Sequence, residues 1–198
     1  MPRTVSKSRN ILLFLSAFFC YCAGVQTVIF LAATFAENEL KFETTELIVI
    51  ILILQLVAIG GAHLFSKISE WRGNKFSLII MLVIWVAICL AANQVYTKTQ
   101  FYILAAAVGL VMGGIQSLSR STYSKLIPEG TKDTTSFFSF YDVLEKVAII
   151  IGTFGFGFIE QIIGSMRSSV LLLAVFFVIG LGILSFVKIR HTREIAVG

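Results

Sequence analysis

The sequence has 198 residues, of which 57% are hydrophobic and only 14% are charged, and its formal net charge is +5. Soluble domains carry about 25% charged residues, so this composition excludes a protein that covers its whole surface with charge in water. The 18 phenylalanines and only 2 prolines are typical of long helices that face lipid. The composition therefore predicts an all-α integral membrane protein.

Six apolar segments of membrane-spanning length follow one another along the chain. They cover residues 11–36, 47–65, 76–92, 101–119, 137–163 and 170–187. A bilayer core requires about 20 apolar residues of helix, and the shortest segment, the third, lies at the low end of the accepted range. None shows the alternating pattern that a membrane β-strand needs. We therefore expect one domain over residues 1–198, built from six transmembrane helices.

The first segment also has one feature of a signal peptide, because it follows a basic N-terminus. Thr34-Phe35-Ala36 would serve as the cleavage site. However, the apolar run is far longer than the roughly 7–15 residues of a signal-peptide core, and it contains Gln26 near its middle. A membrane span is therefore the better interpretation of this segment.

The distribution of basic residues predicts the orientation. If there are six spans, one side of the membrane holds most of the lysines and arginines: Arg3, Lys7, Arg9, Lys67, Arg72, Lys75, Arg120, Lys125, Lys132, Lys188, Arg190 and Arg193. The other side holds only Lys41, Lys98 and Arg167. By the positive-inside rule, both termini are expected in the cytoplasm. Topology and anionic lipid explain the basic charge, so no nucleic-acid partner is predicted.

The cysteines indicate no disulfide framework and no metal site. Cys20, Cys22 and Cys89 all fall within predicted spans, and no Cys or His spacing resembles a set of metal ligands. We therefore predict no metal and no cofactor.

Polar residues within the spans are the most informative feature of the sequence. Gln26, Gln55 and Gln116 lie in the first, second and fourth spans, whereas the middles of the third and sixth spans are almost wholly apolar. Because polar groups are costly in lipid, they usually face a bundle interior or a water-filled cavity. The open alternative is that the glutamines only hold helices together, as Gly109 and Gly113 would through their GxxxG spacing.

The stretch FFSFYDVLEKVAIIIGTFGFGF, residues 137–158, begins the fifth span with three charges. At about 100° per residue, Asp142, Glu145 and Lys146 share one face of a helix. Two interpretations remain open for them. They form either a self-neutralised Asp142–Lys146 pair near the lipid headgroups or a charged cluster at the cytoplasmic mouth of a cavity.

The segments GGIQSLSRSTYSKLIPEG and FFSFYDVLEKVAIIIGTFGFGFIEQIIGSMRSSVLLLAVFF resemble the C-terminal half of one branch of the major facilitator superfamily. This vacuole-effluxer-like branch includes the autophagy-related vacuolar amino-acid effluxers of fungi and many bacterial members. The loop GAHLFSKISEWRGNK is similar to the superfamily's cytoplasmic Gly-x-x-x-Asp-Arg-x-Gly-Arg-Arg motif. Its matching residues are Gly61, Lys67, Arg72, Gly73 and Lys75, while Phe65 stands where the motif has an acid.

The resemblance implies half of a secondary active transporter of small solutes, and not an enzyme. The six spans would be the seventh to twelfth helices of a twelve-helix protein, arranged as a 3+3 inverted repeat that moves by alternating access. The expected membrane is the bacterial inner membrane, and the substrate class is amino acids or related metabolites. The partners would be the bilayer, a small-molecule substrate, and either the missing N-terminal six-helix half or a second copy of the chain.

The resemblance also suggests roles for the polar residues. Gln26, Gln55, Gln116 and Tyr141 would line the substrate pathway. Arg120, Asp142, Glu145 and Lys146 would form a gate or couple transport to an ion. The alternatives are a self-associating structural protein and a membrane-embedded enzyme that uses Asp142 and Glu145.

Overall fold

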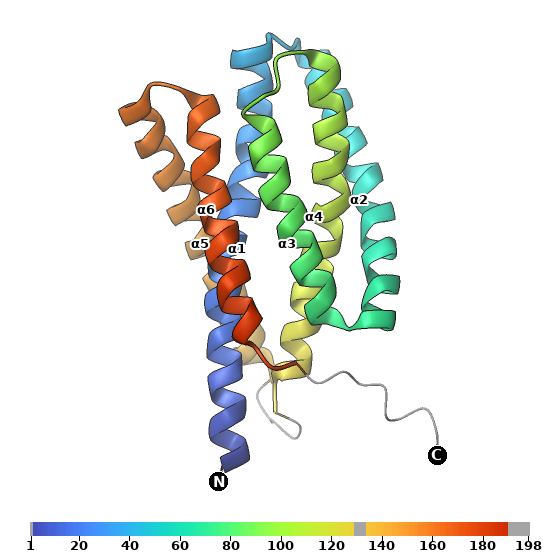
Figure 1. Ribbon diagram of the computed structural model, residues 1–198, viewed down its shortest axis with the longest axis vertical. Coiled ribbons are helices and arrows are strands. Elements are labelled where there is room, and N and C mark those ends of the chain that lie inside the picture. Colours follow the sequence, from blue (N-terminus) through green and yellow to red (C-terminus); the bar gives the residue numbers. More distant parts are fainter. Residues whose placement is uncertain (1, 129–133, 190–198) are drawn as a thin grey trace.

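The computed structural model describes residues 2–128 and 134–189. It contains six α-helices, α1 (Pro2–Leu40), α2 (Thr44–Arg72), α3 (Asn74–Ala92), α4 (Lys98–Leu126), α5 (Thr134–Ile163) and α6 (Met166–Phe186) (Figure 1). All six are long and apolar enough to cross a membrane. The prediction of an all-α membrane protein with six spans is confirmed.

Polar residues at the helix ends extend the helices beyond the apolar segments. At the start of α2, the Glu46 carboxylate accepts a hydrogen bond from the backbone N–H of Glu43 at 2.8 Å. At the start of α4, the Thr97 hydroxyl accepts from the Gln100 N–H at 3.3 Å, while the Gln100 side chain accepts from the Thr97 N–H at 3.2 Å. Such bonds satisfy backbone donors that a helix leaves unpaired at its N-terminus.

Helix α2 packs closely along α4 through glycines. A Cβ atom on Gly61 would lie 1.9 Å from the carbonyl oxygen of Leu110, and one on Gly113 would lie 2.1 Å from that of Ala58. No other residue type fits at these two positions without moving a helix backbone. The interpretation of the small residues as packing devices is therefore correct for this interface.

The rest of the bundle is organised around α1, which packs against both α5 and α6. Helices α3 and α6 pack against each other, and the rings of Trp85 and Phe177 stack between them with their centroids 5.1 Å apart. Both rings are fully buried. The apolar middles of these two helices therefore contribute to the core as well as to the lipid-facing surface.

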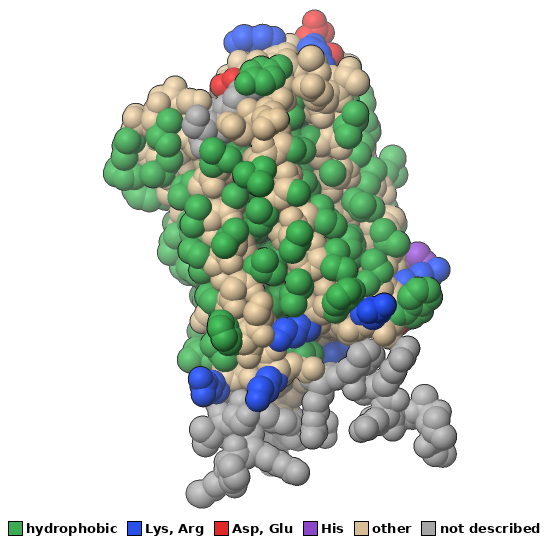
Figure 2. Space-filling model, viewed as in Figure 1, with side chains coloured by type: hydrophobic (Ala, Val, Ile, Leu, Met, Phe, Trp, Pro, Cys, Tyr) green, Lys and Arg blue, Asp and Glu red, His purple; other side chains and the backbone are tan. Residues whose placement is uncertain are grey.

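Helices α2 and α5 form the two lateral edges of the bundle (Figure 1). Each leaves an apolar face exposed, and the exposed side chains include Ile48, Leu52, Leu56 and Ile59 on α2 and Val143, Val147, Ile150, Phe154 and Phe158 on α5. Hydrophobic side chains also cover the middle of the surface in Figure 2. Such surface is suited to lipid or to another membrane-embedded protein.

The two ends of the bundle differ in charge (Figure 2). We call the end that holds Arg72, Lys75, Arg120 and Lys125 the basic end, and the end that holds Glu39, Glu43 and Glu46 the acidic end. Lys132, Arg190 and Arg193, which also entered the charge count, lie outside the described residues. The side of the membrane on which each end lies stays a prediction.

Candidate functional site

A polar cavity of about 330 Å³ lies between α1, α4 and α5, toward the basic end. We call it the polar pocket. Its lining consists of Phe18, Tyr21, Cys22, Val25, Gln26, Ile115, Gln116, Ser119, Arg120, Tyr141 and Glu145. Five residues predicted from the sequence thus meet in one place: Gln26, Gln116, Arg120, Tyr141 and Glu145.

A hydrogen bond joins α1 to α5 across the polar pocket. The side-chain amide of Gln26 donates to Oε1 of Glu145 at 2.8 Å, and both side chains are half-buried. The amide therefore contacts the charged group of α5 that lies deepest in the pocket. Hydrogen bonds to charged groups are stronger than those between neutral ones, so this contact fixes the carboxylate against α1.

An ion pair joins α4 to α5 at the mouth of the same pocket. The Arg120 guanidinium donates to the Asp142 carboxylate, and the guanidinium carbon also lies 5.6 Å from the centre of the Tyr141 ring. The Arg120 and Asp142 side chains are 55% and 50% exposed, so the pair contributes no more than about 1 kcal/mol to stability. A weak pair of this kind is able to open without a large cost.

Stacked aromatic rings lie on the side of the polar pocket that faces the basic end. Tyr141 is buried, and its ring stacks on Phe18 at a centroid distance of 4.1 Å and on Tyr123 at 5.2 Å. On their own helices, Phe18, Tyr123 and Tyr141 lie about one turn nearer the basic end than the pocket residues Tyr21, Ser119 and Glu145, respectively. A further hydrogen bond of 2.7 Å between the hydroxyls of Tyr21 and Ser119 joins α1 to α4.

Gln55 and Lys146 do not join this group. Gln55 is exposed and lines a separate, mostly apolar groove with Ile29 and Met112, which lie one turn from Gln26 and Gln116 toward the acidic end. The groove therefore continues the same side of the bundle. Lys146 is exposed and is not among the residues that line the polar pocket.

The predicted motif loop forms the connection between α2 and α3. Gly73 has a φ of 87°, a backbone conformation that favours glycine, and its N–H donates to the Ser69 carbonyl at 2.8 Å. Lys75 donates to the carbonyls of Ser185 and Val187, both at 2.7 Å, and so ties this turn to the end of α6. The loop thus holds neighbouring helices together at the basic end.

The other residues of the loop are placed differently. Arg72 lies over the Phe76 ring at 5.6 Å, and Lys67 is exposed. Phe65, which stands where the motif has an acid, is buried against Gly114 and Met81. This position therefore fills apolar space in the bundle and makes no polar contact with a neighbouring helix.

Asn74 is a polar residue that the sequence reasoning missed. Its side chain is buried, accepts hydrogen bonds from Ser69 at 2.6 Å and Lys125 at 3.0 Å, and donates to Thr122 at 3.0 Å. It therefore joins the turn between α2 and α3 to the last turns of α4. The available signal was an amide residue directly after a glycine at the start of an apolar run.

A second missed cluster lies at the acidic end. Lys98 and Glu46 form an ion pair with a distance of 2.5 Å, and the Lys98 ammonium lies 5.0 Å from the centre of the Phe42 ring. These contacts fasten the connection between α1 and α2 to the start of α4. Within the part of the chain that the structure describes, no group of three or more His, Cys, Asp or Glu side chains could hold a metal ion.

Comparison with known protein families is consistent with this arrangement. The model of the family described as "Vacuole effluxer Atg22 like" matches residues 1–197. The chain belongs to this Atg22-like family. The resemblance found from the sequence motifs is therefore confirmed, and it extends over nearly the whole chain.

Individual Atg22-like relatives agree with the family match. An uncharacterized MFS-type transporter, YxiO of Bacillus subtilis, is 34% identical over 194 residues, covering 98% of this chain and 45% of that protein. Autophagy-related protein 22-1 of Penicillium rubens is 29% identical over 214 residues, covering 100% of this chain and 36% of that protein. Autophagy-related protein 22 of Cryptococcus neoformans is 26% identical, covering 99% and 37%. The chain thus spans less than half the length of these relatives.

Proposed function

We propose that the chain forms one half of a secondary active transporter that moves small solutes by alternating access. The observation that carries this proposal is the polar pocket, where Gln26, Arg120 and Glu145 converge from three membrane-spanning helices. Ionisable groups are costly in a bilayer and are found there mainly along solute or ion pathways. Membership of a family described as effluxers favours transport over catalysis by the same residues.

The chemistry of the pocket supports small polar solutes, with amino acids or related metabolites as the proposed class. Its volume of about 330 Å³ lies at the lower end of the range for small-molecule sites. Glu145 offers a negative group, Arg120 a positive group, and Gln26 and Gln116 offer amides. In this proposal, solute passes along Gln26, Gln116 and Tyr141, and Gln55 lines the continuation of the path toward the acidic end.

The proposed gate lies at the basic end of the pathway. Arg120 and Asp142 form a weak, exposed ion pair, and stacked rings lie next to it on this side of the pocket. Opening would require α5 to separate from α4 and α1, which breaks the Arg120–Asp142 and Gln26–Glu145 contacts together. Lys146 would then meet charges on the facing half of the transporter, and either Glu145 or Asp142 would couple solute to an ion.

The proposed partner is the other half of the transporter, an N-terminal six-helix unit. The exposed apolar faces of α2 and α5 would pack against that half. We also propose that the chain is a 3+3 inverted repeat. Exchanging α1 with α4, α2 with α5 and α3 with α6 converts the α2–α4 packing into α5–α1 packing, and α3–α4 into α6–α1. A bacterial inner membrane with cytoplasmic termini completes the proposal.

The test is transport by the full-length protein reconstituted in lipid vesicles. We expect uptake of at least one solute from a panel of radiolabelled amino acids, nucleosides and sugars. Gln116→Leu should reduce that uptake strongly, because it removes a polar group from the pocket. The matched control is Gln161→Leu, which makes the same change at an exposed position of α5 outside the pocket and should leave uptake unchanged. No uptake of any solute would refute the proposal that the protein is a transporter, and equal uptake by both variants would refute the pathway through the polar pocket.

A further inference from the structure

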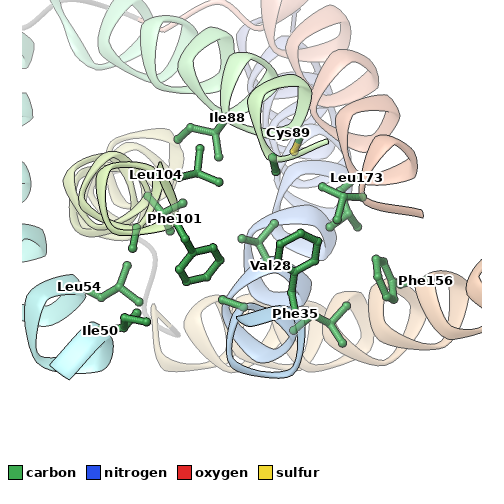
Figure 3. A pocket seen from close by; sticks show the side chains of 16 residues that line it. Val28, Phe35, Ile50, Leu54, Ile88, Cys89, Phe101, Leu104, Phe156 and Leu173 are labelled. Carbon is green, nitrogen blue, oxygen red and sulfur yellow. The ribbon is translucent and has the colours of Figure 1, made fainter. Parts of the chain in front are cut away.

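A second cavity lies between the helices (Figure 3). Its lining residues on α1 and α4 lie nearer the acidic end than those of the polar pocket. Its volume is about 60 Å³, and side chains from all six helices line it, among them Val28, Ile50, Cys89, Phe101, Phe156 and Leu173. Apart from the Cys89 thiol, every lining side chain is a hydrocarbon. This cavity shares Ala32, Ile50 and Leu54 with the groove that Gln55 lines, but none of its lining with the polar pocket, and it has no assigned role.

The lining decides what kind of molecule the cavity can take. An ordered water needs about 2–4 polar partners, and these side chains supply only one weak one. Protein interiors are otherwise packed as densely as organic crystals, so a cavity here forfeits dispersion contacts that an apolar occupant would restore. At about 60 Å³ it is smaller than the apolar cavity of about 150 Å³ that takes up benzene, so it suits the last few carbons of an alkyl chain.

The cavity adjoins a groove on the outside of the bundle. This groove, of about 480 Å³, runs between α3 and α4 and shares Ile88 and Leu104 with the cavity. Its lining also includes Ala107, which precedes Gln116 of the polar pocket by nine residues on α4. At about 100° per residue the two positions lie on opposite sides of the helix. The groove therefore faces away from the solute pathway, on the side that meets lipid.

Like a lipid molecule, the groove is apolar along most of its length and polar at one end. Isoleucine, leucine and alanine side chains line it at membrane depth, and Gln94 and Gln100 line it where α3 ends and α4 begins, at the acidic end. A lipid in the adjacent leaflet would place its polar ester region beside the glutamines and its acyl chain along the apolar part. From there, the end of the chain would enter the cavity beside Ile88 and Leu104, which line both the groove and the cavity.

We infer that the internal cavity is a binding site for the acyl-chain end of a bilayer lipid, which enters through the groove between α3 and α4. An occupant there contacts all six helices at once. It would fill the space that side chains of all six helices line, and so stabilise the packing between them. This inference requires only the membrane location and does not depend on transport.

The protein contains a natural reporter for this site. Trp85 is fully buried on α3, three and four positions before the cavity residues Ile88 and Cys89, and so about one turn away. The chain has 2 tryptophans, and the other, Trp71, is 75% exposed at the end of α2. The variant Trp71→Phe therefore leaves Trp85 as the sole source of tryptophan fluorescence.

The experiment reconstitutes Trp71→Phe in vesicles of a phosphatidylcholine that carries bromine near the ends of its acyl chains. Bromine quenches tryptophan at short range, so we expect a loss of Trp85 fluorescence relative to vesicles of the unbrominated lipid. Adding Ala105→Leu, which fills the cavity from α4, should remove most of that loss. Adding Cys89→Leu, which fills it from α3, should do the same. The control, Ala62→Leu, lies on α2 outside the cavity and should keep the quenching.

Each variant is compared with itself in the unbrominated lipid, so that changes in Trp85 brightness do not count as quenching. Two filling variants on different helices guard against the failure of one to fold, which size-exclusion chromatography would detect. Absence of quenching in Trp71→Phe would overturn the inference. Quenching that both filling variants retain would also overturn it, because the bromine would then reach Trp85 from the lipid around the bundle.

Discussion

Replacing Gly61 with alanine should separate α2 from α4. The new Cβ would lie 1.9 Å from the Leu110 carbonyl oxygen, which is 1.5 Å short of the ordinary contact distance of 3.4 Å. Because the clashing atom belongs to the helix backbone, the two helices must move apart. A gap of about 0.5–1 Å already forfeits a quarter to a half of each dispersion contact along the interface.

The size of the effect follows from two opposing terms. Overpacking typically costs about 1–3 kcal/mol, and a backbone clash this close belongs at the upper end. Alanine recovers about 0.5–1 kcal/mol, because it restricts the unfolded chain more than glycine does. The net loss is therefore about 2 kcal/mol, which lowers the unfolding temperature by about 4–8 °C for a chain of this size.

The neighbouring residue supplies the control. A Cβ on Gly60 would meet no atom within 4 Å, so Gly60→Ala gains the same backbone term without the clash and should raise the unfolding temperature slightly. Unfolding in detergent can be followed with a thiol-reactive dye that reports exposure of Cys22 and Cys89, both of which are buried in the folded bundle. If Gly61→Ala proves as stable as Gly60→Ala, the close α2–α4 packing described here is wrong.

Three further substitutions test individual contacts by the same thermal assay. Asn74→Ala should cost about 1–3 kcal/mol, since it leaves buried partners unpaired; an equal loss in Asn93→Ala, at the other end of α3, would contradict this. Lys98→Ala removes a partly exposed pair with Glu46 and should lower the unfolding temperature only slightly, with the difference from wild type vanishing in high salt; a loss that persists in high salt would contradict a screened surface pair. Thr27→Val should be neutral or stabilising, because the Thr27 hydroxyl is buried without a hydrogen-bond partner among the described residues; a lower unfolding temperature would reveal a bond to that hydroxyl.

The fold was predictable because a membrane span is a local property of the sequence. An apolar run such as residues 76–92 has the length that a bilayer requires, whatever lies elsewhere in the chain. The helix ends were less accessible. They depend on side chains such as Glu46 and Thr97, which bond to the backbone beyond the apolar run and so lengthen the helix by several residues.

The candidate site was predictable only in part. The free-energy cost of polar groups in lipid marked the polar residues of the spans as candidates for a site. Helical periodicity placed Asp142, Glu145 and Lys146 on one broad face. Periodicity gives no information on which neighbouring helix each one meets. Glu145 contacts Gln26 of α1, whereas Lys146 is exposed, and this difference arises from the way in which α5 is rotated against α1.

Polar residues also proved an incomplete guide to which helices line the polar pocket. The second span was expected to face water because it contains Gln55, yet α2 contributes no side chain to the polar pocket. Its close packing along α4 turns Gln55 toward a neighbouring apolar groove. One amide on a helix indicates a face that is costly to leave in lipid, but the position of that face along the pathway depends on packing between helices.

The bond between Gln26 and Glu145 joins residues that lie 119 positions apart, and this has a consequence for biosynthesis. A ribosome completes α1 long before it has made α5, so the newly inserted α1 carries an amide whose eventual acceptor does not yet exist. Hydrocarbon offers no substitute. Until the four following helices have emerged, the Gln26 amide therefore depends on other partners, such as a neighbouring helix or the insertion machinery.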